Sequence, residues 1–159
     1  MCAEKPEIVQ KAMIVCADRT LAYRVLKEIL KIRPEWGIAK KCEDESRFSE
    51  DELDQLVEIP KINLVATRGE NDESELYNLC GTKEYRAKLD EQFKNTQSNF
   101  KIAIVVDMWI TGFDVPSLSV MYIDKPLQKH TLIQTISRVN RVFEGKDKGL
   151  IVDYIGIKA

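Results

Sequence analysis

The sequence predicts an α/β fold, with an open, doubly wound and mostly parallel sheet of about five strands between two layers of helices. Short apolar runs rich in β-branched residues recur along the chain and are bounded by turn residues, which is typical of buried parallel strands. Segments with helical spacing of apolar residues separate several of these runs, and this alternation favours a three-layer α/β/α arrangement. We expect strands over residues 12–16, 61–67, 101–106, 118–123 and 149–154.

Caps and apolar stripes locate the expected helices. Asp18 provides an N-cap for a first helix, and Pro34 ends it. A second helix precedes the strand over 101–106. The apolar stripe of the first helix consists of Leu21, Val25, Ile29 and Ile32, and that of the second of Tyr85, Leu89 and Phe93.

Residues 43–58 are strongly acidic, with eight acidic side chains and one basic side chain. Ser49 and Glu52 have the spacing of a capping box, which predicts a short helix. Because DNA phosphates repel such a segment, we expect a surface insertion that faces away from nucleic acid.

Length and composition indicate one domain, residues 1–159. The chain is 44% hydrophobic, which is enough to bury a core. Its net charge of −2 excludes a whole-surface attraction to nucleic acid and is compatible with a local basic track. We expect a cytoplasmic protein without membrane contact, since the sequence has neither a signal peptide nor an apolar run that could span a bilayer.

The cysteines indicate no metal site and no disulfide framework. Cys2, Cys16, Cys42 and Cys80 are scattered, and the only histidine is His130. Zinc sites and disulfide scaffolds need closely spaced ligands or regular cysteine patterns. We therefore expect reduced thiols and no metal ligands in this chain.

The segment 134–141 predicts a helix with two different faces. Gln134, Arg138 and Arg141 recur at i, i+4 and i+7, which places them on one stripe. The guanidinium fork matches phosphate oxygens, so this stripe indicates phosphate recognition, although a surface helix with solvated arginines has the same pattern. The opposite side, Leu132, Ile136, Val139 and Phe143, is expected to face the core.

Several polar loops are expected to meet at one edge of the sheet, because open α/β sheets bind ligands where their strands end. Asp18 and Arg19 follow the first strand, Thr67 and Arg68 follow the next, and residues 107–114 follow the strand over 101–106. The start of the arginine helix reaches the same edge. Asp18 as a helix cap and Arg68 as a loop charge are the alternative interpretations.

Two of these segments carry a family resemblance. Residues 107–114, D-M-W-I-T-G-F-D, resemble motif V of superfamily 2 helicases, and residues 134–141 resemble motif VI, Q-x-x-G-R-x-x-R, with Ser137 in the place of the glycine. The sequence of residues 101–157 is similar to that of the motor (R) subunit of type I restriction endonucleases. Val106 stands where many helicases have a DNA-contacting threonine before motif V.

The resemblance implies the C-terminal one of two RecA-like domains in a helicase core. Arg138 and Arg141 would then be the catalytic residues that reach the γ-phosphate of ATP across a cleft. The remaining implied contacts are Gln134, Gly112 and Asp114 with ATP, and Arg19, Thr67, Arg68 and Asp107 with DNA.

A motor ATPase also needs a Gly-rich phosphate loop and a Walker B acid, and neither occurs in the 159 residues. ATP and Mg²⁺ would be bound mainly by an N-terminal RecA-like domain of the same protein. We therefore expect a fragment of a larger protein that is inactive alone, with the nuclease site elsewhere. Duplex DNA and the modification and specificity subunits of a type I complex are the other partners that the resemblance implies.

Two alternatives remain at this point. One is a domain of another superfamily 2 DNA or RNA helicase. The other is a non-catalytic nucleotide-binding regulatory module, which is disfavoured because no strand is followed by G-x-G-x-x-G.

Overall fold

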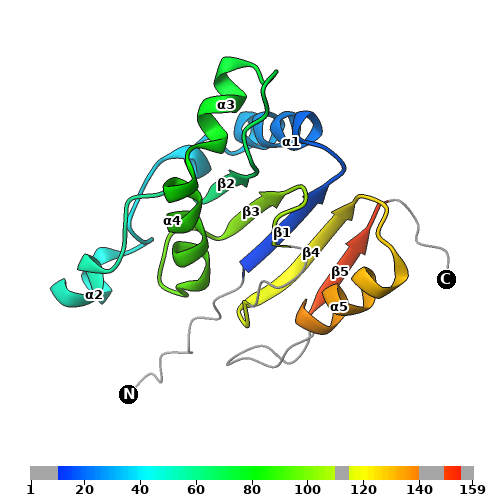
Figure 1. Ribbon diagram of the computed structural model, residues 1–159. Coiled ribbons are helices and arrows are strands. Elements are labelled where there is room, and N and C mark those ends of the chain that lie inside the picture. The colour runs from blue at the N-terminus through cyan, green and yellow to red at the C-terminus, as the bar shows by residue number, and fades with distance from the viewer. Residues whose placement is uncertain (1–10, 110–114, 140–148, 155–159) are drawn as a thin grey trace.

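The computed structural model describes residues 11–109, 115–139 and 149–154, without the side chain of Arg138. This part of the chain contains five strands and five α-helices (Figure 1). None of the described helices has the length and apolar character of a membrane span. In chain order the elements are β1 (Lys11–Cys16), α1 (Arg19–Ile32), η1 (Pro34–Gly37), η2 (Glu45–Arg47), α2 (Glu50–Asp54), β2 (Ile62–Val65), α3 (Ser74–Cys80), α4 (Lys83–Lys94), β3 (Ile102–Val105), β4 (Leu118–Asp124), α5 (Lys129–Val139) and β5 (Leu150–Asp153).

The five strands form one parallel sheet in the order β2-β3-β1-β4-β5. β1 lies at the centre, where Met13 pairs with Ala103 of β3 on one side and with Met121 of β4 on the other. All strands therefore end at one common edge, here called the carboxyl edge, and start at the opposite amino edge. This sheet confirms the open, parallel, five-stranded α/β fold class predicted from the sequence.

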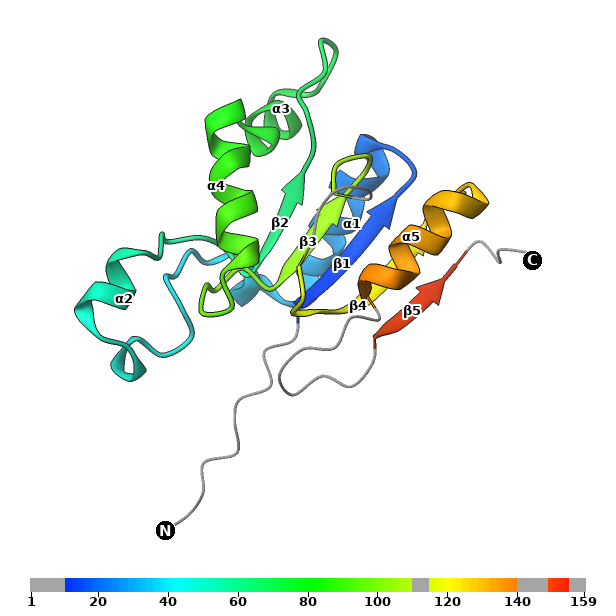
Figure 2. The ribbon, with the colours of Figure 1, turned by 60° about the horizontal axis from the view of Figure 1, so that its bottom comes forward.

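Helices cover the two faces of the sheet (Figure 2). One core contains Leu89 and Phe93 of α4 and Val139 of α5, packed against the sheet residues Met13 and Ile123. The other core joins α1 and α3 to the opposite face, through Tyr23, Leu26, Leu76 and Cys80 among others. Parallel sheets need apolar cover on both faces, which explains why the strand sequences are almost continuously apolar.

The cap of α1 was predicted correctly, but part of its buried face was not. The Asp18 carboxylate accepts a hydrogen bond from the Leu21 amide at 2.7 Å, as an N-cap does. The fully buried residues of α1 are Ala22, Tyr23 and Leu26, whereas Ile32 is 76% exposed. The prediction that Ile32 is a core residue is wrong, because the helix ends there and turns into η1.

Two further core predictions need correction. On α4, Leu89 and Phe93 are fully buried as expected, but Tyr85 is 37% exposed. On α5, Ile136 is 41% exposed, and the buried residues are Thr135 and Val139, with Leu132 partly buried. Since α5 packs against β4 and β5 along the stripe through residues 132, 135 and 139, Ile136 lies one position around the helix from the core.

The acidic segment lies mostly at the surface. The predicted capping box is present: the Ser49 hydroxyl accepts from the Glu52 amide, and the Glu52 carboxylate accepts from the Ser49 amide at 2.9 Å. It begins the short helix α2. Leu56 and Ile59 are buried and attach the end of this segment to the domain.

Lys11 is fully buried, although it is a lysine at the start of the central strand. Its Nζ lies within hydrogen-bonding distance of the carbonyl oxygens of Gln92 at 3.1 Å, of Asn95 at 2.7 Å and of Phe93, and so caps the end of α4; the ammonium form can donate to all three and the neutral amine to two. Burial, with a smaller contribution from the positive charge of Lys101, lowers the pKa of Lys11 to about 6.

This shift predicts a pH dependence of stability. Between about pH 6 and about pH 10 the unfolded chain binds a proton on Lys11 that the folded chain does not bind, so the contribution of Lys11 to stability rises with pH. We expect the free energy of unfolding of the wild type, relative to Lys11→Met, to increase across this window in urea titrations. Lys88→Met, at an exposed lysine of α4, is the control and should leave the pH profile unchanged. A flat difference for Lys11→Met would contradict the prediction.

Candidate functional site

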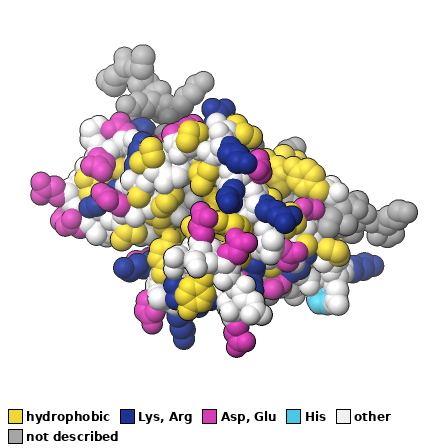
Figure 3. Space-filling view, turned by 90° about the horizontal axis from the view of Figure 1, so that it is seen from above, with side chains coloured by type: hydrophobic (Ala, Val, Ile, Leu, Met, Phe, Trp, Pro, Cys, Tyr) yellow, Lys and Arg dark blue, Asp and Glu magenta, His cyan; other side chains and the backbone are white. Residues whose placement is uncertain are grey.

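A cavity of about 220 Å³ lies at the carboxyl edge, where β1, β2 and β3 end. Three loops line it: Ala17 to Arg19 after β1, Ala66 and Thr67 after β2, and Val106 to Met108 after β3. The sequence placed these same loops at one edge, and the structure brings them together. Figure 3, seen from above relative to Figure 1, shows acidic and basic side chains interspersed on the visible face.

Arg19 is held by the loop that follows β2. Its Nη1 atom lies 2.5 Å from Asp72 Oδ2 and 3.2 Å from the Thr67 carbonyl oxygen, to which it donates a hydrogen bond. The Arg19 side chain is 33% exposed and that of Asp72 only 5%. The guanidinium therefore connects the start of α1 to the loop that carries Thr67.

Arg68 is fixed to α3. Its Nε donates to the Tyr77 carbonyl oxygen at 2.9 Å, and its guanidinium lies 4.1 Å from the centroid of the Tyr77 ring. Such a cation–π contact restrains the side chain while it remains partly exposed. Thr67 itself is exposed beside it.

Asp107 is exposed at the end of β3 and forms an ion pair with Lys125, which follows β4. The Lys125 ammonium also donates to the Val106 carbonyl oxygen at 3.2 Å. Lys125 thus reaches past the end of the central strand and neutralises a carboxylate beside the cavity.

The loop after Asp107 starts with a strained residue. Trp109 has φ 67°, a left-handed conformation that is costly for a bulky side chain. Its ring is 8% exposed and stacks on Phe93 at 5.3 Å between centroids. Packing against α4 therefore fixes the point at which the chain leaves the carboxyl edge. Gly112 and Asp114, the predicted ATP contacts, lie outside the described residues.

The arginine helix connects the two edges of the sheet. β4 ends at the carboxyl edge and β5 starts at the amino edge, so α5 runs back across the sheet over 11 residues, about 16 Å. Its last residue, Val139, lies against Gly149, where an added methyl group would overlap the Val139 carbonyl. Gln134 is exposed midway along α5. Position 138 lies in its last turn, towards the amino edge, and Arg141 lies outside the described residues.

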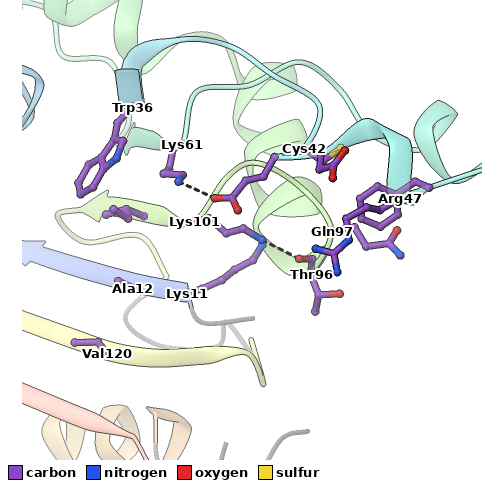
Figure 4. Close-up of a pocket in the computed structure, with 14 residues that line it drawn as sticks. Lys11, Ala12, Trp36, Cys42, Arg47, Lys61, Thr96, Gln97, Lys101 and Val120 are labelled. Atoms are coloured by element: carbon purple, nitrogen blue, oxygen red, sulfur yellow. Dashed lines mark hydrogen bonds and ion pairs between the residues drawn. The ribbon is translucent and has the colours of Figure 1, made fainter. Parts of the chain in front are cut away.

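A larger hollow, about 690 Å³, lies at the amino edge (Figure 4). Its lysines already have partners: Lys61 forms an ion pair with Glu43 at 2.7 Å, and Lys101 donates to the Thr96 carbonyl oxygen at 2.9 Å. Lys11, the third, caps α4. The three lysines that line the hollow therefore make contacts within the protein.

The buried thiols lack the lowered pKa that is typical of nucleophilic cysteines. Burial, together with the nearby carboxylates of Asp124 and Asp18, raises the pKa of the Cys16 thiol to about 11. Burial also raises the pKa values of Cys42 and Cys80. Among the described residues no cluster of histidine, cysteine and acidic side chains could hold a metal ion.

Two residues of the site, Lys125 and Asp72, were not predicted from the sequence. Lys125 follows a strand at the carboxyl edge, so the rule that gathered the other loops also selects it. Asp72 had no local signal, because its partner Arg19 is 53 positions away and only the tertiary fold brings them together.

Comparison with known proteins decides the family. The family model for domain 3 of the type I restriction enzyme subunit R matches residues 28–156. This chain belongs to the type I restriction enzyme subunit R domain 3 family. This match confirms the resemblance found in the sequence. It also sets aside the alternative that the chain is a domain of another superfamily 2 helicase.

Relatives of this subunit R domain are much longer. The HindI endonuclease subunit of Haemophilus influenzae is 35% identical over 159 residues, which are 98% of this chain and 14% of that protein. The putative MjaIXP endonuclease subunit of Methanocaldococcus jannaschii is 50% identical over 99 residues, 62% of this chain and 10% of that protein. Among solved structures, the C-terminal domain of S. cerevisiae Dbp5 is similar with a TM-score of 0.49 at 18% identity, over 90% of this chain and 59% of that one.

Proposed function

We propose that this chain is the second motor domain of an ATP-dependent DNA translocase, the R subunit of a type I restriction enzyme. The observation that carries the proposal is that two groups of predicted site residues lie at different places on the domain. Three loops meet at a cavity on the carboxyl edge, and α5 carries the motif VI arginine at position 138 towards the amino edge.

The carboxyl edge is suited to the DNA backbone. Thr67, Arg68 and Asp107 lie in the loops there, with Arg19 beside them at the start of α1, and the ion pair with Lys125 offsets the negative charge of Asp107, which would otherwise repel phosphate. Contacts of this kind position a protein on DNA without reading its sequence. The acidic segment 43–58 is expected to take no part in DNA binding.

The ATP side combines residues from two segments. In the sequence, Gly112 and Asp114 stand between β3 and β4, and Gln134 and Arg138 stand in α5, between β4 and β5. We propose that Gly112, Asp114 and Gln134 contact the nucleotide and that Arg138 and Arg141 stabilise charge on its γ-phosphate.

The residues present fit only part of an ATP site. The sequence has no phosphate loop and no Walker B acid. We propose that ATP and Mg²⁺ are held mainly by an N-terminal RecA-like domain of the same protein, and that closure and opening of the cleft between the domains move the protein along duplex DNA.

The whole protein is proposed to be an ATP-dependent type I site-specific deoxyribonuclease of the cytoplasm, in complex with modification and specificity subunits. Its nuclease site is expected outside this chain. The names of the relatives, which are endonuclease subunits of type I restriction enzymes, support this assignment.

The proposal predicts that the 159-residue chain alone does not hydrolyse ATP, whereas a subunit that also contains the N-terminal motor domain does so when duplex DNA is added. The reason is that positioning of the phosphates and of magnesium depends on residues missing from this sequence. Phosphate release is the measurement. Turnover above background that stays with the isolated chain through further purification would overturn the two-domain assignment.

A further inference from the structure

Three residues hold the loop after β2: Arg19, Gly69 and Asp72, which we call the clasp. One carboxylate oxygen of Asp72 accepts from the Arg19 guanidinium at 2.5 Å and from the Gly69 amide at 2.6 Å. The Asp72 amide donates back to the Gly69 carbonyl oxygen at 3.3 Å, and Arg19 also donates to the Thr67 carbonyl oxygen. The clasp therefore closes the loop on itself and joins it to the first turn of α1.

The environment of Asp72 makes this arrangement specific. Its side chain is 5% exposed, so its charge needs the Arg19 partner, and charge-assisted hydrogen bonds of this type are stronger than neutral ones. The acceptor oxygen is shared between a side chain of α1 and a backbone amide of the loop. Loss of the carboxylate would release both contacts at once.

Gly69 contributes through its missing side chain. A methyl group at this position would overlap the Arg19 guanidinium, whose terminal atoms occupy the space where the Cβ would lie. The guanidinium is the end of a flexible side chain, so Gly69→Ala should displace it. This substitution opens the clasp without changing any charge.

We propose that the clasp positions the Thr67–Arg68 segment at the rim of the carboxyl-edge cavity for contact with DNA. In this assignment Arg19 is a positioning residue whose charge is used within the protein, and Asp72 and Gly69 are required to hold it there. Thr67 and Arg68 are the residues that face the DNA. The inference rests on the proposed function where the DNA dependence of hydrolysis is measured. The second measurement, exchange of the Gly69 amide, depends on the loop geometry alone.

The test compares Asp72→Ala, Asp72→Asn and Gly69→Ala in the full motor subunit. The control is Glu43→Ala, which removes a comparable ion pair with Lys61 at the opposite edge. We expect the Gly69 amide to exchange with solvent about tenfold faster in Asp72→Ala, and Asp72→Asn, which keeps an acceptor, to show a smaller increase. The concentration of DNA that half-saturates ATP hydrolysis should rise about fivefold or more in Asp72→Ala and Gly69→Ala, and should stay at the wild-type value in Glu43→Ala.

Two results would overturn the proposal. One is an unchanged Gly69 exchange rate in Asp72→Ala, which means that no clasp exists in solution. The other is faster exchange with the same half-saturating DNA concentration as Glu43→Ala, which means that the clasp has no role in DNA contact. If the wild-type subunit itself shows no DNA stimulation, the proposed function fails, and the exchange measurement still decides whether the clasp holds the loop. If Asp72→Ala does not fold, the Gly69 exchange rate in Asp72→Asn provides this decision.

Discussion

Replacing Arg138 or Arg141 by Ala in the full motor subunit is expected to lower ATP hydrolysis by about 10³- to 10⁵-fold, or roughly 4 to 7 kcal/mol of transition-state stabilisation. An arginine brought across a cleft neutralises charge that develops only during phosphoryl transfer, so its loss affects the chemical step. DNA-stimulated phosphate release, measured with saturating ATP and DNA, is the readout.

The controls for this prediction come from α5 itself. Position 138 shares the helical stripe of Gln134, which is exposed, so the arginine substitutions should leave the domain folded. Val139→Ala should do the reverse, because Val139 is fully buried and its loss should lower the stability by roughly 2 kcal/mol, with little direct effect on hydrolysis. Ile136→Ala should change stability by less than about 1 kcal/mol, since Ile136 is 41% exposed.

Near-normal hydrolysis in either arginine variant, with an unchanged melting curve, would show that this arginine is an ordinary surface charge. The assignment of Arg138 and Arg141 would then fail, whereas the family membership of the chain would stand.

Phe93→Ala is expected to lower the free energy of unfolding by about 3 to 5 kcal/mol, which is a large part of the roughly 5 to 15 kcal/mol that stabilises a typical domain. Phe93 is fully buried and packs against two other rings, Phe100 at 4.9 Å and Trp109 at 5.3 Å between centroids, which also contact each other at 6.3 Å. The variant leaves a cavity and also removes the contact that holds Trp109 in its strained conformation. Urea unfolding of the 159-residue chain is the measurement.

Tyr85→Ala is the matched control for Phe93→Ala. The sequence places both residues on one stripe of α4, but Tyr85 is 37% exposed. We expect its replacement to cost about 1 kcal/mol. Equal decreases in the free energy of unfolding for the two variants would mean that the stripe is buried along its whole length. That result would agree with the sequence pattern and contradict the structure.

Much of the fold was predictable from the sequence. Strands such as 101–106 are recognisable because a strand buried on both faces must be apolar at every position, which leaves a continuous β-branched run. Local hydrogen bonds are equally predictable: the Asp18 cap and the Ser49–Glu52 capping box connect residues three positions apart. The motifs at 107–114 and 134–141 identified the family, since their residue types and spacing are specific.

Tertiary structure decided which positions of each stripe are buried. Ile32, Tyr85 and Ile136 have the spacing of core residues, yet each is exposed. Ile32 lies where α1 ends, Tyr85 lies in the first turn of α4, and Ile136 lies one position around α5 from the buried residues. A helical repeat defines a face about 100° wide, and its exact centre depends on the sheet against which it packs.

The partners of charged residues were also decided by the tertiary structure. Arg19 with Asp72 and Asp107 with Lys125 are pairs of residues far apart in the sequence, and Lys11 looks like a surface lysine until α4 is folded over it. The sequence alone determined the order of strands and helices and the family motifs, because these depend on neighbouring residues. Only the folded sheet determined which charges meet at its carboxyl edge, because ion pairing depends on distance in space and strand order brings distant segments together.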